Sequence, residues 1–287
     1  MFRTLRSLHS RRTGFSRVSS RLLHFLLGAP SASPVPPGSC ILTEDFTSLP
    51  LLSKQQVNHD TNVYTFATLA TNQPLNLSTC ACILAATTTN DETIVRPYTP
   101  ISTNAQLGSF DLLVKHYPEG QLSAAFNALQ VGETMDFKHI AFNVKIQYPF
   151  EKKHITMIAG GTGITPMIQA LHAILGTKED DTTVHLLYGS KSQDDIIAGE
   201  QIEEWAANSN GRLVVTHVLS NEPADSDWTG EVGYIDERIL PAPSLDSVVF
   251  ICGPDQMYQK LSGGRTEEQV TGVLGKMGYT SEQVVKF

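Results

Sequence analysis

The chain has 287 residues, of which 41% are hydrophobic and 17% are charged. This length and balance predict a globular protein of two ordinary domains and exclude a disordered or fibrous chain. The net charge is −8, but six arginines precede the first acidic residue, Glu44, which leaves 15 basic against 29 acidic residues, or −14, for the rest. A body of that charge does not bind nucleic acid through bulk charge, so no such partner is expected.

Residues 1–38 are predicted to be a mitochondrial targeting segment and a linker. The stretch is rich in arginine and serine with interspersed Leu and Phe, a composition typical of a mitochondrial presequence. The alternative is a disordered basic tail. Residues 22–27 are apolar apart from His24 and far short of the roughly 20 residues that cross a membrane, although contact with a membrane surface stays open. Residues 31–38, which contain three prolines, predict the linker.

Residues 41–147 are expected to form an antiparallel β-barrel or sandwich. Four segments rich in Val, Ile, Thr, Phe and Tyr alternate with turn residues, namely 62–69, 93–102, 110–117 and 134–146. A helix is predicted over residues 123–129, with Ser123 as its N-cap. Cys80 and Cys82 would share one face of a strand, and we interpret both as small apolar core residues.

Residues 148–287 are expected to form an α/β domain with a parallel sheet. Strands are predicted at 155–159, 183–189, 213–219 and 247–252, and helices at 166–175, 199–208, from 255 onward and at 267–277. In such sheets ligands bind at the carboxyl ends of the strands, near the switch in strand order. No cluster of His or Cys has the spacing of a metal site, so no metal is expected.

Two glycine-containing turns fall where this α/β domain would bind ligands. Residues 159–166, Ala-Gly-Gly-Thr-Gly-Ile-Thr-Pro, follow a strand and open a helix, an arrangement that favours an anionic phosphate. No Lys follows the glycines at P-loop spacing. Residues 251–258 begin Ile-Cys-Gly-Pro after another strand, which predicts a sharp turn that presents the thiol of Cys252. Each turn taken alone is equally consistent with tight packing or an inert buried thiol.

The first half contributes residues 96–102, which begin Arg-Pro-Tyr-Thr. An arginine there can hold a pyrophosphate with two hydrogen bonds, and the tyrosine offers an aromatic face. Alone, the segment could be a plain strand end. Together and in this order, the three segments resemble the ferredoxin-reductase-like flavoproteins, most closely the NADH–cytochrome b5 reductases. The resemblance covers about residues 41–287, including 228–235 and 278–287, and implies an FAD-binding β-barrel over 41–147 and an NADH-binding α/β domain over 148–287.

The resemblance also implies roles for individual residues on the flavin side. Arg96 is expected to neutralise the FAD pyrophosphate, while Tyr98 and Thr99 contact the ribityl chain and the flavin ring. Thr99, Thr162 and Cys252 are the expected catalytic residues, because they surround the place where the nicotinamide meets the flavin. The other cofactor-binding residues implied are Pro97, Val114, His116, Tyr117, Gly120, Gln121, Leu122, Ser123, Gly161, Gly163, Thr165, Gly253, Pro254, Met257 and Phe287.

On the NADH side, the resemblance implies roles for Lys115 and Asp195. Lys115 is expected to reach bound NADH. A carboxylate at Asp195 would accept hydrogen bonds from the ribose hydroxyls and repel a 2′-phosphate, which favours NADH over NADPH. The alternative for Asp195 is a solvated residue at a helix start.

The chain departs from the family pattern in two places. It reads Lys138-His139-Ile140 where the family usually has Gly-Pro, which leaves FMN open as an alternative to FAD. It reads Cys80-Ala81-Cys82 where Gly-x-His is common.

The electron acceptor is expected to be another protein, because the chain has no heme motif and no iron–sulfur cysteine spacing. The resemblance implies cytochrome b5 as the acceptor and a monomeric enzyme. Two other hypotheses stay open: a reductase for an oxygenase or nitrate-reducing system, and a non-catalytic mitochondrial protein with the same fold. A basic patch for the acceptor, with a solvated hinge as the alternative, is hypothesised at Lys138, His139, Lys145, Lys152, Lys153 and His154.

Overall fold

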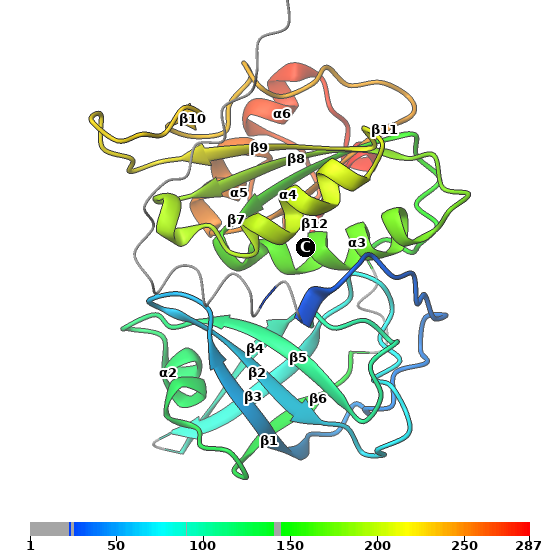
Figure 1. The fold of residues 1–287 in the computed structure, drawn as a ribbon, viewed down its shortest axis with the longest axis vertical. Helices are drawn as coiled ribbons and strands as arrows, with labels where there is room; N and C mark the ends of the chain where they lie inside the picture. Colours follow the sequence, from blue (N-terminus) through cyan, green and yellow to red (C-terminus); the bar gives the residue numbers. More distant parts are fainter. Residues whose placement is uncertain (1–22, 24–25, 90, 141–144) are drawn as a thin grey trace, which may run out of the picture.

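The computed structural model describes residues 23, 26–89, 91–140 and 145–287, drawn as the coloured ribbon in Figure 1. Most of the predicted targeting segment therefore lies outside the described residues. Within the described part of the chain, no helix is long and apolar enough to cross a membrane.

The first domain is a six-stranded antiparallel sheet in the order β4-β3-β6-β1-β2-β5. Its strand β1 pairs with β6 through Thr47–Pro50 and with β2 from Leu51 onward, and the register of the second pairing shifts between Leu51 and Ser53. The outer strands β4 and β5 do not pair, but Ile101 N donates to the Asp111 carbonyl at 2.9 Å just beyond β4. The result is a partly open barrel. The strands are β1 (Thr47–Gln56), β2 (Thr61–Ala67), β3 (Ile83–Thr89), β4 (Glu92–Tyr98), β5 (Ser109–Lys115) and β6 (Thr134–Lys138).

An aromatic cluster fills this barrel, and helix α2 (Gln121–Ala128) closes one end of it. Phe66, which is fully buried, lies 4.7 Å from Phe137 and 6.0 Å from Phe126 between ring centroids. Phe126 projects from α2 and also packs edge-on against Tyr98 at 5.1 Å. The helix is thereby tied to the end of β4, where the predicted flavin contacts lie.

The second domain is a six-stranded parallel sheet in the order β10-β9-β8-β7-β11-β12. Its first strand, β7, lies between β8 and β11, so the switch in strand order falls between β7 and β11. This is where an open α/β sheet binds its ligands. The strands are β7 (His154–Gly160), β8 (Thr183–Ser190), β9 (Leu213–Leu219), β10 (Glu231–Val232), β11 (Ser247–Cys252) and β12 (Val284–Lys286).

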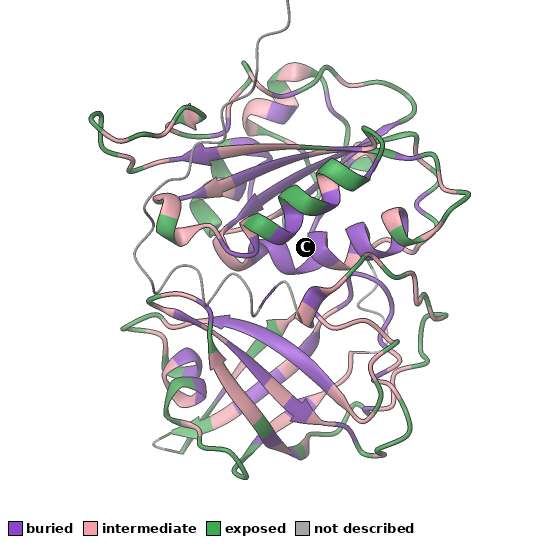
Figure 2. Cartoon of the chain, in the orientation of Figure 1, coloured by how far each residue is buried: buried purple, intermediate pink, exposed green. Residues whose placement is uncertain are grey.

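Helices cover both faces of this sheet, so its central strands β7 and β11 are buried except at one end of each (Figure 2). One face carries α3 (Ile164–Gly176) and α4 (Gly199–Asn208), and the other carries α5 (Asp255–Leu261) and α6 (Gly272–Met277). Successive residues of β7 alternate between the two cores. Met157 packs with the α3 side, and Ile158 packs with the α5 side.

Helix α3 also forms the contact between the domains (Figure 1). Its apolar residues share one core with Val63 and Leu113 of the barrel. The side chain of Gln169 on α3 donates hydrogen bonds to the carbonyls of Pro100 and Ser102, both at 2.7 Å. A shared apolar core with partly buried hydrogen bonds fixes the two domains relative to each other more firmly than a wet interface would.

The residues that precede the barrel form an ordered N-terminal strap, which we define as residues 26–38. Within it, the carbonyl of Gly28 accepts a hydrogen bond from Trp205 Nε1 at 2.9 Å, and Ser31 N donates to His172 Nδ1 at 3.2 Å. Further along, Asn104 Nδ2 donates to the Ser33 carbonyl at 3.0 Å. The predicted linker at 31–38 is therefore bonded to both domains.

Several local predictions are wrong. The helix predicted at 267–277 begins only at Gly272, and the strand predicted at 93–102 ends at Tyr98. Helix α2 begins at Gln121 with Gly120 as N-cap, because the Ser123 hydroxyl instead bonds the turn before the helix. Strand β6 ends at Lys138 rather than at 146, since the next backbone N–H leaves the sheet to bond Thr43. Cys80 and Cys82 lie in the turn before β3 rather than on a strand, with Cys80 at a φ of 63°.

Candidate functional site

A pocket of about 500 Å³ lies between the two domains. From the barrel it is lined by the end of β4, the end of β5 and the start of α2. From the α/β domain it is lined by the turns that follow β7 and β11, at the switch in strand order. Its position is the one that the fold of the second domain predicts for a ligand.

The two turns of the α/β domain touch each other, which requires glycine. A Cβ on Gly163 would overlap the carbonyl oxygen of Cys252, and a Cβ on Gly160 would lie 2.7 Å from the Met257 Cε. Gly161–Gly163 form one 3-10 turn before α3, and no acidic residue occupies the first turn of that helix. Its free backbone N–H groups and the positive end of its dipole therefore suit an anionic ligand.

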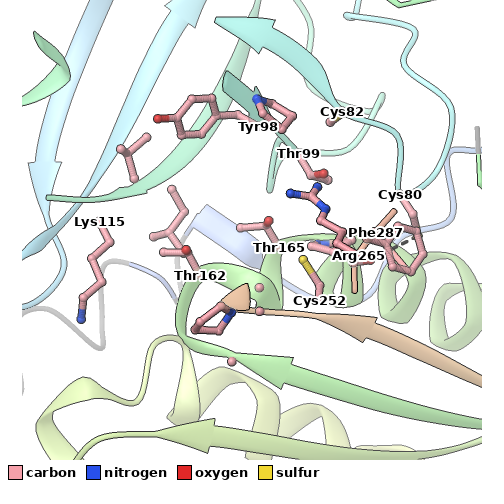
Figure 3. Close-up of a pocket in the computed structure, with 18 of the residues that line it drawn as sticks. Cys80, Cys82, Tyr98, Thr99, Lys115, Thr162, Thr165, Cys252, Arg265 and Phe287 are labelled. Atoms are coloured by element: carbon pink, nitrogen blue, oxygen red, sulfur yellow. Dashed lines mark hydrogen bonds between the residues drawn. The ribbon is translucent and has the colours of Figure 1, made fainter. Parts of the chain in front are cut away.

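Four of the predicted residues face one space from opposite sides. Thr99 points into the pocket from the barrel, and Thr162, Thr165 and Cys252 point into it from the α/β domain (Figure 3). Burial raises the pKa of the Cys252 thiol to about 11, so the thiol is neutral at physiological pH. The arrangement brings small hydroxyl donors and one neutral thiol around a gap that a flat ring can enter.

Tyr98 and Arg96 lie on the same strand but have different surroundings. Tyr98 lines the pocket, and its ring packs against Phe126. Burial raises the pKa of Tyr98, so its hydroxyl is a neutral donor. Arg96 is exposed and lies outside the pocket lining, with Nη1 donating to the neighbouring Val95 carbonyl at 2.8 Å. Because side chains two apart on a strand share a face, the guanidinium lies on the same face as Tyr98.

The start of α2 forms a third part of the wall. Ser123 Oγ accepts a hydrogen bond from Tyr117 N at 3.1 Å and donates one to the Gly120 carbonyl at 2.9 Å. Tyr117 and Ser123 line the pocket. Leu122 is buried in the barrel core and Gln121 is exposed, so of these two neither contributes its side chain to the pocket wall.

Lys115 and Asp195, both expected to contact NADH, are bonded to each other across the domains. Lys115 Nζ lies 3.3 Å from Asp195 Oδ1 and 2.7 Å from Asp60 Oδ2. Burial alone would lower the pKa of Lys115, but its hydrogen bond to Asp60 and the charges of both carboxylates outweigh burial and raise it. Burial alone would raise the pKa of Asp195, but hydrogen bonding by Ser192 and the charge of Lys115 lower it. Lys115 and Asp195 are therefore both charged at neutral pH.

The pocket thus brings together most of the predicted site residues. Those that line it are Pro97, Tyr98, Thr99, Val114, Lys115, Tyr117, Ser123, Thr162, Gly163, Thr165, Cys252, Gly253, Pro254 and Phe287. Those outside its lining are Arg96, His116, Gly120, Gln121, Leu122, Gly161, Asp195 and Met257.

Other lining residues had not been singled out as flavin or NADH contacts. Cys80 and Cys82 line the pocket, so they are not simply core residues, although Cys80 is buried and donates to the Pro166 carbonyl at 3.2 Å. Their place in the chain, where the family commonly has Gly-x-His, was the available signal. Arg265 comes from a loop between α5 and α6 that has no periodic pattern. The remaining additions are Leu113, Lys145, Gly160, Pro166 and Asp255.

The residues present fit a flavin with a diphosphate tail. Besides Lys115, which is paired with Asp60 and Asp195, the lining carries two cationic side chains, Lys145 and Arg265, against one acidic side chain, Asp255. Glycine turns allow close approach of the backbone, and the tyrosines offer aromatic surface. A negatively charged, partly planar group is what such a lining accommodates.

The comparisons with known proteins agree with this assignment. The family profile described as "Oxidoreductase FAD-binding domain" matches residues 48–145, and the one described as "Oxidoreductase NAD-binding domain" matches residues 157–262. The fold, the pocket and these matches define a two-domain FAD- and NAD-binding oxidoreductase.

Individual relatives narrow the class. The chain is 35% identical over 253 residues to NADH-cytochrome b5 reductase 2 of Meyerozyma guilliermondii, covering 85% of each chain. It is 34% identical to an NADH-cytochrome b5 reductase-like protein of Arabidopsis thaliana, covering 88% of this chain and 79% of that one. The chain belongs to the NADH–cytochrome b5 reductase family.

A solved structure supports the same fold. The cytochrome b5 reductase domain of Ulva prolifera nitrate reductase superposes with a TM-score of 0.72 at 28% identity, over 89% of this chain and 100% of that one. The prediction of a ferredoxin-reductase-like fold, with an antiparallel barrel followed by a parallel α/β sheet, is confirmed.

Proposed function

We propose that this chain is an NADH-dependent flavoprotein reductase whose electron acceptor is cytochrome b5. The observation that carries the proposal is the placement of Thr99 and Cys252 on opposite sides of one pocket at the domain boundary. The barrel side suits the flavin, and the α/β side suits the nicotinamide. Bound FAD supplies hydride acceptance from NADH and the release of single electrons, which no amino-acid side chain provides.

On the barrel side, the chain's own residues bind and orient the flavin. Arg96 would neutralise the pyrophosphate once its guanidinium turns from the Val95 carbonyl, and the backbone N–H groups of residues 121–123 at the start of α2 would add donors. Tyr98 and Thr99 would hold the ribityl chain and ring. The Thr99 hydroxyl and N–H would act as fixed donors to the ring, and donors already in place cost no reorganisation during the reaction.

On the α/β side, the two touching turns position the nicotinamide. Thr162 and Thr165, at the start of α3, offer hydroxyl donors beside N–H groups that suit the NADH phosphates. The neutral thiol of Cys252 fills space against the ring without adding charge. With Gly253, Pro254 and Phe287 it excludes water from the point where the hydride moves.

The second candidate acceptor is a component of a nitrate-reducing or oxygenase system, because the similar Ulva prolifera domain belongs to a nitrate reductase. Steady-state turnover with NADH should be measured with cytochrome b5, with a ferredoxin and with an artificial dye as a control for flavin reduction. The proposal predicts that cytochrome b5 gives the highest turnover of the two proteins. Normal dye reduction with no turnover of cytochrome b5 would contradict cytochrome b5 as the acceptor, but the chain would still be an NADH-dependent reductase.

The hypothesised basic patch is divided by the fold. Lys145 lines the pocket, as does Gly160 at the carboxyl end of β7. Lys152, Lys153 and His154 lie at the amino end of that strand, which the rise per residue of a β-strand puts roughly 20 Å from Gly160. We therefore propose that Lys145 faces an acidic acceptor. Lys145→Glu should weaken the salt dependence of electron transfer to cytochrome b5, and Lys153→Glu is the matched control. Equal effects of the two variants would contradict this role.

We also propose that residues 1–38 direct the protein to mitochondria, that the N-terminus touches a membrane surface at most peripherally, and that the enzyme is a monomer. The arginine- and serine-rich composition supports the first point. Import of a fluorescent protein fused to residues 1–38 tests it, and a diffuse distribution in the cell would contradict it.

A further inference from the structure

Asp60 joins Lys115 and Asp195 in a charged cluster across the domain boundary. We define this Lys115 cluster as His59, Asp60, Lys115 and Asp195. The first three come from the barrel, where 58–60 form the turn between β1 and β2, and Asp195 follows β8 in the other domain. One ring nitrogen of His59 and one carboxylate oxygen each of Asp60 and Asp195 all lie within 4.8 Å of one another.

Lys115 is bound more closely by Asp60 than by Asp195. Its ammonium lies 2.7 Å from Asp60 Oδ2 but 3.3 Å from Asp195 Oδ1, and all three side chains are less than a quarter exposed. Figure 3 shows the Lys115 ammonium at one end of the pocket, pointing away from the group around Cys252 and Arg265. Asp60 thus holds the lysine charge at the edge of the nucleotide site.

The structure fixes both carboxylates independently of Lys115. Asp60 Oδ1 accepts the Thr61 hydroxyl at 2.9 Å, and the Asp60 carbonyl accepts His116 N at 2.7 Å. Asp195 Oδ2 accepts Ser192 Oγ at 2.8 Å and Ser192 N at 3.2 Å. Neither carboxylate can turn away easily, so one lysine stays shared between two fixed negative charges.

The charge balance of the cluster bears on which nucleotide it accepts. Two carboxylates and one ammonium leave −1, before any proton on His59, which is 60% exposed. If Asp60 were absent, Lys115 and Asp195 would cancel, and a lysine free of its closer partner would be available to a phosphate. Rejection of a competing ligand often depends on such an unfavourable charge placed near the site.

We propose that Asp60 is a second determinant of NADH over NADPH, a positioning residue that neutralises Lys115 and withholds it from a 2′-phosphate. The proposal rests on the proposed function, in which Asp195 binds the adenosine ribose of NADH. It adds a carboxylate from the flavin-binding domain to the specificity of the nucleotide-binding domain.

The test compares binding of two probes to the flavin-loaded enzyme, adenosine 2′,5′-bisphosphate and AMP, by calorimetry at low salt. Asp60→Asn should tighten binding of the bisphosphate on the order of tenfold and change AMP binding by less than about twofold, because only the bisphosphate carries the extra charge. High salt should reduce the gain. The ratio of kcat/KM for NADPH over NADH should rise in parallel.

Companion variants separate this role from a structural one. Asp60→Glu keeps the charge and should keep wild-type selectivity, and Asp60→Ser should act in the same direction as Asp60→Asn if the amide disturbs the turn. The double variant with Asp60→Asn and Lys115→Met restores the cluster charge of −1, so its affinity for the bisphosphate should return to the wild-type value. Asp181→Asn is the matched control. Asp181 pairs with Lys153 at 3.7 Å, and this exposed pair lies just before the amino ends of β7 and β8.

Two results would overturn the proposal: an unchanged bisphosphate affinity in both Asp60→Asn and Asp60→Ser, or a gain that survives Lys115→Met. Failure of the underlying function is distinguishable. Asp195→Asn should weaken binding of AMP, whose ribose keeps both hydroxyls. If it does not, the assignment of Asp195 to the ribose fails, whatever Asp60 does.

Discussion

A substitution at Arg96 should change the affinity for FAD without changing the stability of the fold. The guanidinium of Arg96 is exposed, and within the described part of the chain its hydrogen bond goes to the carbonyl of the neighbouring Val95, so the fold does not depend on it. Arg96→Gln should weaken FAD binding about 10- to 100-fold, the value of a lost charge-assisted hydrogen bond, and leave the melting temperature of the flavin-free protein unchanged. Titration of the flavin-free protein with FAD by fluorescence quenching measures the affinity.

The control for this prediction is Arg238→Gln, because Arg238 is also exposed and pairs with Asp236 at 3.1 Å in the second domain. It should bind FAD as the wild type does. An equal loss of affinity in both variants, or a loss of stability in Arg96→Gln, would contradict the assigned role.

At the residue scale, the sequence was sufficient for side chains beside turns and insufficient for contacts between segments that are distant in the chain. Thr99, Thr162 and Cys252 follow strands at recognisable glycine or proline turns, and the pocket brings them together. Nothing in the sequence placed Asp60 against Lys115, because that contact depends on how β1, β2 and β5 pair. Arg265 was missed because its loop has no period, although Lys286 Nζ pins that loop by donating to the Gly264 carbonyl at 2.9 Å.

At the scale of elements, the contact between the two ligand-binding turns is the most sensitive feature. Gly163→Ala places a methyl group against the Cys252 carbonyl, which is backbone and cannot move aside easily. The variant should lose at least 2 kcal/mol of unfolding free energy, as in overpacked cores, and should bind NADH more weakly because the turns separate. Chemical denaturation measures the first effect, and titration of NADH measures the second.

Gly189→Ala is the comparison, since a Cβ there would meet its nearest neighbour, Met257 Cε, at an ordinary 3.5 Å. It should stay within about 1 kcal/mol of the wild type. If Gly163→Ala were as well tolerated as Gly189→Ala, the turns would not be in the contact described.

Elements with strong apolar runs were predictable, and polar ones were not. The strands β7, β8 and β11 of the parallel sheet are buried and read as continuous apolar stretches. The strands β1 and β3 were not identified, because β1 ends in Ser-Lys-Gln-Gln and β3 in three threonines. Strand order cannot be read from such patterns, since it depends on pairings between distant segments.

At the scale of the whole molecule, the N-terminal strap makes stability depend on pH through His172. Its Nδ1 accepts the Ser31 N–H at 3.2 Å, so the ring must be neutral, and burial lowers the pKa of His172 from 6.5 to about 4. A lowered histidine pKa contributes stability above pH 6.5 that is lost as the pH falls toward 4. The loss should be on the order of 3 kcal/mol.

His172→Phe tests this coupling, because a phenyl ring keeps an aromatic contact with Trp205, which lies 4.8 Å away in the wild type. The variant should be about 1 kcal/mol less stable at neutral pH, where the Ser31 N–H loses its acceptor, and should lose less stability on acidification. Unfolding free energies measured across this pH range provide the comparison. An unchanged slope would show that His172 does not link the strap to pH.

The whole molecule places a barrel that suits FAD and an α/β sheet that suits NADH on either side of one pocket, and one measurement tests that claim most directly. The visible flavin spectrum of the FAD-loaded protein is recorded without oxygen, then after NADPH, then after NADH and finally after oxidised cytochrome b5. The account predicts slow bleaching by NADPH, rapid bleaching by NADH and recovery of the oxidised spectrum with cytochrome b5. A protein that cannot be loaded with FAD, or whose flavin NADH does not bleach, would contradict it.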